Sequence, residues 1–232
     1  MYRVLSKTIQ SLKISMPSQK LWLPLVISLE IILVSIYAVS IHLSGGKPFP
    51  AFDVDGLRTI PSMLQATQLF LLGALPLWMC ATYRNPQVPP SRMLLAIASA
   101  FFLYASIDET FKLNQIFHQH HLWRLIYITL GISMPLLFRR DFVRLWRMHP
   151  KAAQRIIIGI IVFVTGAFGL EIFRAYVEQP YWYQLFGRWK FYQVDSIRTA
   201  IEEFGEMCGE SLVLSGMIMM VQKRLEKVSS GL

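Results

Sequence analysis

The sequence predicts an all-α integral membrane protein, a bundle of six transmembrane helices that forms a single domain over residues 1–232. Hydrophobic residues make up 54% of the chain and charged residues 16%, against about 45–50% and 25% in soluble domains. Apolar runs recur from end to end, which leaves little room for a separate soluble domain of ~50 residues or more. The runs lack the period-two alternation of barrel strands, so we expect helices.

Six apolar runs approach the ~20 residues that a helix needs to cross a hydrocarbon core about 30 Å thick. We expect helices near residues 22–43, 61–83, 93–110, 122–138, 156–177 and 199–221. The third run is the shortest and ends at the acidic pair Asp108 and Glu109. Aromatic residues crowd the segment 181–192 before the last helix. Because amphipathic rings prefer the headgroup region, this segment is expected to lie at the membrane interface.

Basic residues divide unequally between the two sides of a six-helix protein. Most of the 23 Lys and Arg residues fall in the N-terminal tail, the segments 84–92 and 139–155, and the C-terminal tail. Short cytoplasmic loops carry an excess of Lys and Arg. We therefore expect both termini to be cytoplasmic, in a multi-pass protein of the cell inner membrane or of a specialised internal membrane.

The net charge of +9 raises the question of a nucleic-acid partner. A nucleic-acid footprint is a basic face with aromatic or polar readers, whereas the cations here flank apolar segments. No nucleic-acid partner is expected. The expected partners are membrane lipid and either other membrane subunits or further copies of the chain.

The last predicted helix carries a row of glutamates: Glu202, Glu203, Glu206 and Glu210. Spacings of three, four and seven put the last three on one face, with the first alongside. Like charges held this close repel one another, so we expect protons, basic side chains or a metal ion to neutralise part of them. Gly205 and Gly209 lie four residues apart beside this face and allow a neighbouring helix to approach closely.

Polar residues also interrupt three other predicted helices. Glu30 is the lone carboxylate near the middle of the first helix, and Gln65 and Gln68 on the second can donate hydrogen bonds to the glutamate region. On the fifth helix, Glu171 and Arg174 are spaced to form an ion pair. Carboxylates inside a membrane are costly, so they generally face the bundle interior and mark a functional site.

A second polar patch follows the third helix and contains Asp108, Glu109, His118, His120 and His121. Imidazole and carboxylate ligands suit zinc, iron, copper or manganese. A divalent transition metal is therefore the candidate cofactor, with Glu109, Glu206, Glu210 and His118 as its candidate ligands. Against this, the chain has no Glu-x-x-His pair of the kind that bundle di-metal sites use. Solvated loop histidines are the alternative, and the sequence leaves the two open.

Two segments together carry a resemblance to a known group of proteins. They are Ser106-Ile-Asp108-Glu109-Thr-Phe-Lys-Leu113-Asn114-Gln115 and Glu202-Glu203-x-x-Glu206-x-x-Gly209. The chain resembles uncharacterised bacterial polytopic membrane proteins that pair a Ser-Leu-Asp-Glu…Leu-His-Glu helix end with a Glu-Glu-x-x-Glu…Gly helix. This chain has Asn114-Gln115 where the pattern has His-Glu, which keeps size and hydrogen bonding but removes a strong ligand and a charge. The resemblance implies the topology and singles out the acidic residues, but it implies no reaction.

Three functions fit these features. The first is a carboxylate-rich site near the non-cytoplasmic side that binds a metal ion, protons or a small cationic ligand, formed by Asp108, Glu109, Glu202, Glu203, Glu206 and Glu210. The second is a non-catalytic accessory subunit of a membrane complex, because no catalytic signature such as Gly-x-Ser-x-Gly or His-Glu-x-x-His is present. The third is a proton- or ion-coupled transporter or channel. Whether the protein catalyses any reaction stays open.

Overall fold

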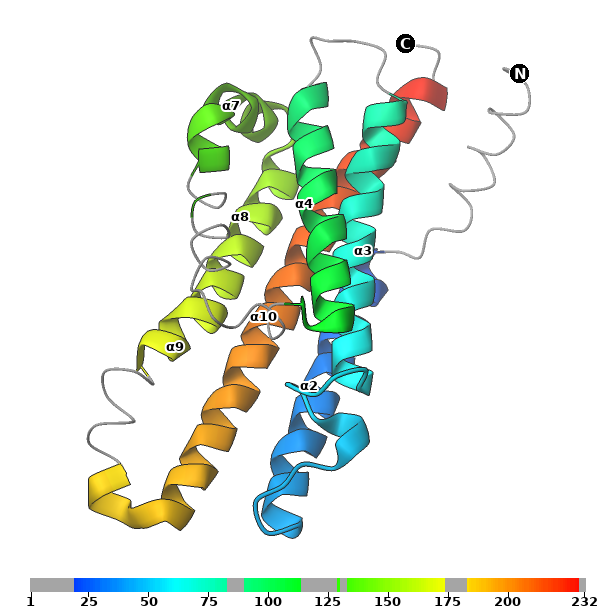
Figure 1. Ribbon diagram of the computed structural model, residues 1–232. Helices are drawn as coiled ribbons and strands as arrows, with labels where there is room; N and C mark the ends of the chain where they lie inside the picture. Colours follow the sequence, from blue (N-terminus) through cyan, green and yellow to red (C-terminus); the bar gives the residue numbers. More distant parts are fainter. Residues whose placement is uncertain (1–18, 83–89, 114–128, 130–132, 174–182, 230–232) are drawn as a thin grey trace.

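The structure is a computed structural model that describes residues 19–82, 90–113, 129, 133–173 and 183–229, and in these residues it is helical (Figure 1). Its helices are α2 (Gln19–Leu43), α3 (Ile60–Ala81), α4 (Arg92–Phe111), α7 (Arg139–Met148), α8 (Pro150–Val164), α9 (Leu170–Phe173) and α10 (Tyr183–Ser229). A short 3-10 helix, η1 (Pro50–Phe52), follows α2, and a π-helical turn, η2 (Thr165–Gly169), joins α8 to α9.

Five described segments are long and apolar enough to cross a membrane, which fits a multi-pass membrane protein. They are Leu21–Leu43, Ile60–Ala81, Arg92–Phe111, Pro150–Gly169 and Asp195–Glu226. The runs expected near 22–43, 61–83 and 93–110 correspond to α2, α3 and α4. The run expected near 122–138 lies mostly outside the described residues.

The last two expected helices begin earlier than the sequence predicts. The helix expected near 156–177 begins at Pro150, and the helix expected near 199–221 begins at Tyr183. The segment 139–155, expected to be a loop, contains α7 and the first six residues of α8. The reason is that an apolar run marks only the part of a helix inside the hydrocarbon core, whereas the backbone hydrogen bonds continue through polar turns beyond it.

Two described helices begin at side-chain caps. The Thr59 hydroxyl accepts a hydrogen bond from the Ser62 backbone N–H at the start of α3, and Ser91 Oγ accepts one from Leu94 N at the start of α4. These caps satisfy donors that have no partner within the helix. At its other end, α4 stops at the C-cap residue Lys112, whose φ of 46° and ψ of 48° are the left-handed conformation.

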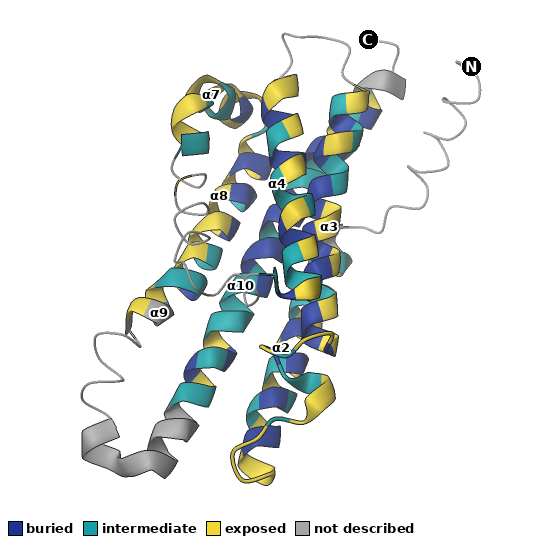
Figure 2. Ribbon diagram, in the orientation of Figure 1, coloured by how far each residue is buried: buried dark blue, intermediate teal, exposed yellow. Residues whose placement is uncertain are grey.

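Helix α10 is the centre of the bundle. It runs between α8 on one side and α2 and α3 on the other, and α4 packs on α3 (Figure 1). The main apolar core joins these helices, with Leu72 of α3, Leu95 of α4 and Leu214 of α10 each at most 3% exposed. Buried residues follow the inward faces in Figure 2, and α10 presents them on several sides.

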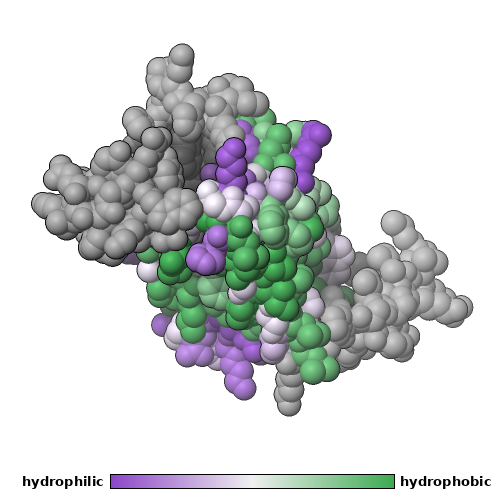
Figure 3. Space-filling model, turned by 90° about the horizontal axis from the view of Figure 1, so that it is seen from below, coloured by the Kyte–Doolittle hydropathy of each residue, from purple (hydrophilic) through white to green (hydrophobic). Residues whose placement is uncertain are grey.

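Large apolar side chains also cover the outside of the bundle. Ile158 and Ile161 of α8 and Leu25 and Ile32 of α2 are all at least half exposed. The view from below shows hydrophobic residues over much of the described surface (Figure 3). Such a surface is unfavourable in water and suits contact with lipid tails.

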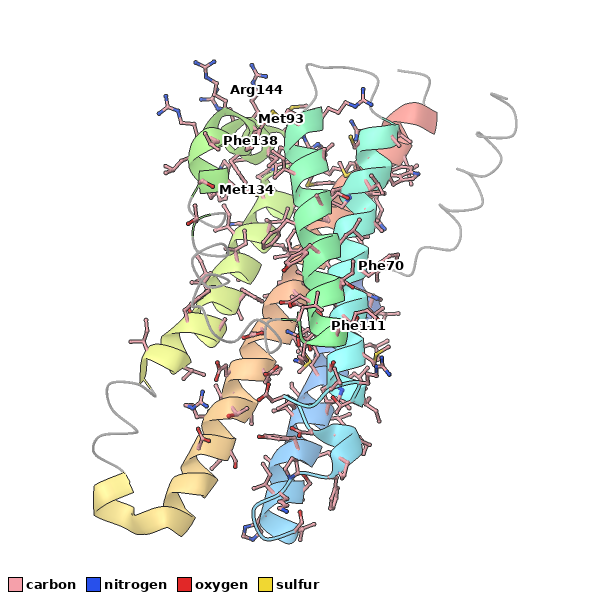
Figure 4. The ribbon with its side chains drawn as sticks, in the orientation of Figure 1. Phe70, Met93, Phe111, Met134, Phe138 and Arg144 are labelled. Carbon is pink, nitrogen blue, oxygen red and sulfur yellow. The ribbon has the colours of Figure 1, made fainter. Side chains whose placement is uncertain are left out.

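The two ends of the bundle differ in charge. At one end, here called the carboxylate end, α2 and α4 finish and α3 begins, close to the acidic part of α10 (Figure 1). At the other, the α7 end, α3 and α10 finish and α4, α7 and α8 begin. Four exposed arginines belong to α7, namely Arg139, Arg140, Arg144 and Arg147. Figure 4 shows Arg144 at this end and Phe111 near the carboxylate end.

Candidate functional site

Glutamates of α10 face a glutamine of α3 inside the bundle. The Nε2 group of Gln65 donates to Glu206 Oε2 at 3.2 Å and to Glu210 Oε1 at 3.4 Å. Gln65 is 4% exposed and Glu210 is 3% exposed. The four-residue spacing of the two glutamates lets one amide reach both, because such residues lie one above the other on a helix. The hydrogen-bonding role expected for Gln65 is therefore confirmed.

Helix α4 contributes an ion pair at the carboxylate end. The ammonium of Lys112 lies 2.7 Å from Glu109 Oε1, and the two side chains are 9% and 16% exposed. Lys112 is also the residue at which α4 ends, because its backbone is left-handed. Burial lowers the pKa of the Lys112 ammonium, but the carboxylates of Glu109, Glu203 and Asp55 raise it, and the net shift is upward.

The α10 glutamates and the α4 pair form one electrostatic group. Glu203, Glu206 and Glu210 each interact with the Glu109 carboxylate, and Lys112 interacts with the first two. Within the described part of the chain, Glu203 makes no hydrogen bond or ion pair of its own. The sequence-predicted face of α10 therefore lies within electrostatic reach of Glu109.

A separate polar contact lies deeper in the bundle and joins three helices. Glu30 of α2 is 0% exposed, and its Oε1 accepts a hydrogen bond from Gln68 Nε2 of α3 at 2.7 Å. The same oxygen accepts from the Ser211 hydroxyl of α10 at 2.6 Å. Gln68 Nε2 also donates to Ser211 Oγ at 3.0 Å. Glu30 and Glu210 interact electrostatically, so this contact continues the row of carboxylates inward.

Several buried acceptor oxygens in this region lack a donor among the described residues: Glu30 Oε2, Gln68 Oε1 and Glu210 Oε2. Each belongs to a side chain that is at most 4% exposed. A buried polar atom without a partner is destabilising, by about 1–3 kcal/mol in typical cases. The oxygens therefore need a donor or a cation. Together we call Glu30, Glu109, Glu203, Glu206 and Glu210 the carboxylate seam.

Two of the expected site residues have other surroundings. Glu202 forms an ion pair with Arg198, which also contacts Asp195 Oδ1 at 2.9 Å, so these three side chains balance much of their own charge. Asp108 is half-buried and lies within electrostatic reach of Glu109. Glu202 also interacts electrostatically with Glu206, so both residues lie at the edge of the seam rather than within it.

The expected metal ligands are only partly described. Glu109, Glu206 and Glu210 share the seam, but no group of three or more His, Cys, Asp or Glu residues in the described ranges has the geometry to hold a metal ion. His118, like His120 and His121, falls outside those ranges. The Arg174 side chain and that of Glu171 also fall outside, so their expected pairing stays a prediction.

Close packing of α8 against α10 holds the glutamate helix in position. A Cβ added to Gly209 would lie 2.7 Å from the Gly159 carbonyl oxygen, and one added to Gly205 would lie 3.0 Å from Gly166 Cα. The close approach expected at Gly205 and Gly209 is confirmed; Gly209 meets α8 and Gly205 meets the turn η2 that follows it. This contact turns the glutamate face of α10 toward α2, α3 and α4.

Sequence reasoning missed Lys112 and Ser211. Lys112 stands three residues after Glu109, a spacing that permits a helical ion pair and was a usable signal. Ser211 gave no signal, because a serine in an apolar helix commonly bonds to its own backbone. Its link to Glu30 spans 181 residues of sequence.

Comparison with known proteins gives one match. A family model described as a domain of unknown function, DUF8692, matches residues 22–221, which include α2 through most of α10. Neither the curated proteins nor the solved structures contain a match to the chain.

Proposed function

The chain belongs to the DUF8692 family, and from the arrangement of its buried carboxylates we propose that it binds protons or a small cation inside the membrane. The observation that carries this proposal is the charge of the carboxylate seam. Among the described residues, Lys112 is the ammonium that faces Glu109, Glu203 and Glu206. One positive charge cannot neutralise the whole seam.

The physical cost of that imbalance is large. Charged side chains in a membrane interior cost several kcal/mol each unless they are paired, neutralised or solvated in a cavity. Repulsion between neighbouring carboxylates adds to this cost in a medium of low dielectric constant. Bound protons or a cation remove both costs, so the empty, fully ionised seam is the least stable state.

The chemistry of the donors favours a proton or a hard cation over a softer transition metal. The seam offers carboxylate and amide oxygens, which suit protons and hard ions such as Na⁺, Ca²⁺ or Mn²⁺. Softer transition metals prefer imidazole or thiolate ligands, and Cys208 is the one such side chain that lies near a seam carboxylate in the described residues. A metal held with His118 becomes one outcome of the binding experiment below.

We further propose that the protein has six transmembrane helices with both termini in the cytoplasm. Helix α4 finishes at the carboxylate end, whereas α7 begins at the opposite end (Figure 1). That α4 finishes at one end and α7 begins at the other supports the span predicted near 122–138. The exposed arginines of α7 favour the α7 end as cytoplasmic, and the seam then opens to the other side.

Cysteine labelling tests this topology. In a chain that carries Cys80→Ala and Cys208→Ala, we expect a cysteine at Leu57 to react with a membrane-impermeant maleimide in right-side-out vesicles. Leu57 is 56% exposed near the carboxylate end. A cysteine at Arg144 of α7 should react only after permeabilisation. Labelling of both positions from the same side, or the reverse pattern, would show that the proposed topology is wrong.

Replacement of a central seam carboxylate tests the binding function. We expect Glu206→Gln to weaken cation binding by about 10- to 100-fold, because even groups outside the ligand shell of a cation site have effects of this size. The purified protein would be titrated calorimetrically with Na⁺, Ca²⁺ and Mn²⁺, and its proton uptake would be measured between about pH 5 and 9. If protons alone bind, the variant should take up about one proton fewer.

The matched control is Glu226→Gln, the same change on an exposed glutamate of α10 at the α7 end. It should leave binding and proton uptake unchanged. Elemental analysis of protein purified without chelator shows whether a transition metal occupies the site instead. Equal binding and equal proton uptake by wild type and Glu206→Gln would reject the proposal and favour the accessory-subunit role.

A further inference from the structure

Glu30 has surroundings unlike those of the other seam carboxylates. It is 0% exposed, and its contacts come from Gln68 of α3 and Ser211 of α10. Glu210 and Cys208, both on α10, are the titratable groups within its electrostatic reach in the described residues. None of these neighbours is a cation that could balance an ionised Glu30.

The hydrogen atoms available to Glu30 can be counted. Gln68 Nε2 donates to both Glu30 Oε1 and Ser211 Oγ. The Ser211 hydroxyl uses its single hydrogen toward the same Glu30 oxygen. Every one of these hydrogen bonds ends on Glu30 Oε1 or Ser211 Oγ, so Glu30 Oε2 and Gln68 Oε1 remain two acceptors without a donor among the described residues.

Turning the Gln68 amide over does not solve this problem. Oxygen and nitrogen of an amide are assigned from the hydrogen-bond network and can be exchanged. In the flipped orientation the amide oxygen would face the Glu30 carboxylate, and two acceptors would again meet without a hydrogen between them. In either orientation, at least one acceptor oxygen of the Glu30–Gln68 pair has no donor among the described residues.

We propose that Glu30 binds a proton on Oε2, as a neutral acid held between Gln68 and Ser211. This proton supplies the missing donor, and Gln68 Oε1 is the acceptor that the same side-chain pair provides. The inference rests on the proposed function of the seam and deepens it, since it names the proton as the ligand at the inner end.

A metal cation fits this position less well. Ca²⁺ takes 6–8 oxygen ligands and Mg²⁺ takes about six. We call the contact among Glu30, Gln68 and Ser211 the inner contact. Together with the neighbouring Glu210 it offers three unpartnered oxygens in the described residues, one each from Glu30, Gln68 and Glu210. A proton needs one donor atom and one acceptor, which Glu30 and Gln68 supply.

Glutamine at position 30 is a close mimic of the protonated acid, and this makes the proposal testable. In Glu30→Gln, an amide N–H replaces the proposed O–H and the carbonyl oxygen still accepts from Gln68 and Ser211. We expect the full-length variant to melt within about 2 °C of wild type in detergent. Glu30→Leu leaves Gln68 and Ser211 without these bonds and should melt clearly lower.

Infrared difference spectroscopy in H₂O and D₂O detects the protonated carboxyl group directly. Wild type should show the C=O stretch of a protonated carboxyl at neutral pH, and Glu30→Gln should lack that band. Ser211→Ala removes one donor to the carbonyl and should move the band to higher frequency, which gives a second variant that retains Glu30. Glu206→Gln should keep the band even though it weakens cation binding, so failure of the two proposals can be told apart.

Two results would overturn the proposal. One is a band that is the same in wild type and Glu30→Gln, which would place the protonated carboxyl elsewhere. The other is a Glu30 carboxylate signal that responds to Na⁺ or Ca²⁺ but not to pH, together with a large loss of stability in Glu30→Gln. That second result would assign a metal cation to the inner contact.

Discussion

Gly209→Ala is expected to destabilise the protein by at least the ~1–3 kcal/mol that is usual for overpacking. The new Cβ would lie 2.7 Å from the Gly159 carbonyl oxygen and 2.7 Å from the Phe163 backbone nitrogen. Both atoms belong to the α8 backbone, so no side-chain rotation relieves the contact. The helices would have to separate, which would loosen the packing that orients the glutamate face of α10. Heating in detergent followed by size-exclusion chromatography measures the loss as a lower melting temperature.

The matched control is the same substitution at Gly169. Among the described residues, a Cβ there would meet only Thr165 Cγ2, at 3.7 Å, which is an ordinary contact distance. Because alanine is favoured over glycine in helices by about 0.5–1 kcal/mol, Gly169→Ala should be neutral or stabilising. The two substitutions therefore differ in the sign of their effect. Equal melting temperatures for both variants would mean that α8 and α10 are not in close contact at Gly209.

This contact also shows what the sequence could and could not predict about the fold. The step from Gly205 to Gly209 was visible because residues four apart share a helix face. The identity of the facing helix was not visible, since Gly159 and Gly166 lie in a run that reads simply as apolar. Helix ends were misplaced for a related reason: hydropathy reports the hydrocarbon core, whereas α10 continues through Arg198 and Asp195 beyond the apolar run.

The candidate site, too, could be predicted from the sequence only in part. Glu203, Glu206 and Glu210 could be grouped from helical periodicity alone, because they lie on one element. The inner contact could not, because Gln68 reaches Glu30 across 38 residues of sequence and Ser211 across 143. Which helices are neighbours is decided by packing in three dimensions, and a single sequence contains no direct record of that.

Lys112→Met is expected to destabilise the protein by about 3–5 kcal/mol, because it removes one partner of a buried ion pair and leaves the other charge in place. The Lys112 side chain is 9% exposed and lies 2.7 Å from Glu109 Oε1, so little solvent screens the remaining carboxylate. The pKa of Lys112 lies above its ordinary value of 10.5. Its contribution is therefore fully present below about pH 10 and is lost as the pH rises through the raised value.

A double-mutant cycle separates this ion pair from the general loss of a lysine. Glu109→Gln combined with Lys112→Met removes both charges and should recover part of the stability that Lys112→Met loses, because no unpaired charge remains. Lys47→Met replaces an exposed lysine at the same end and should change the melting temperature little. Additive effects of Glu109→Gln and Lys112→Met would contradict a direct pair.

The Lys112 ammonium also interacts with Glu109 and Glu203, two carboxylates of the proposed binding site. If the seam binds a cation or protons as proposed, Lys112→Met should raise that uptake by about one charge while it lowers stability. Higher uptake together with lower stability is expected if the Lys112 ammonium competes with the ligand. If Lys112 has a purely structural role, only the loss of stability is expected.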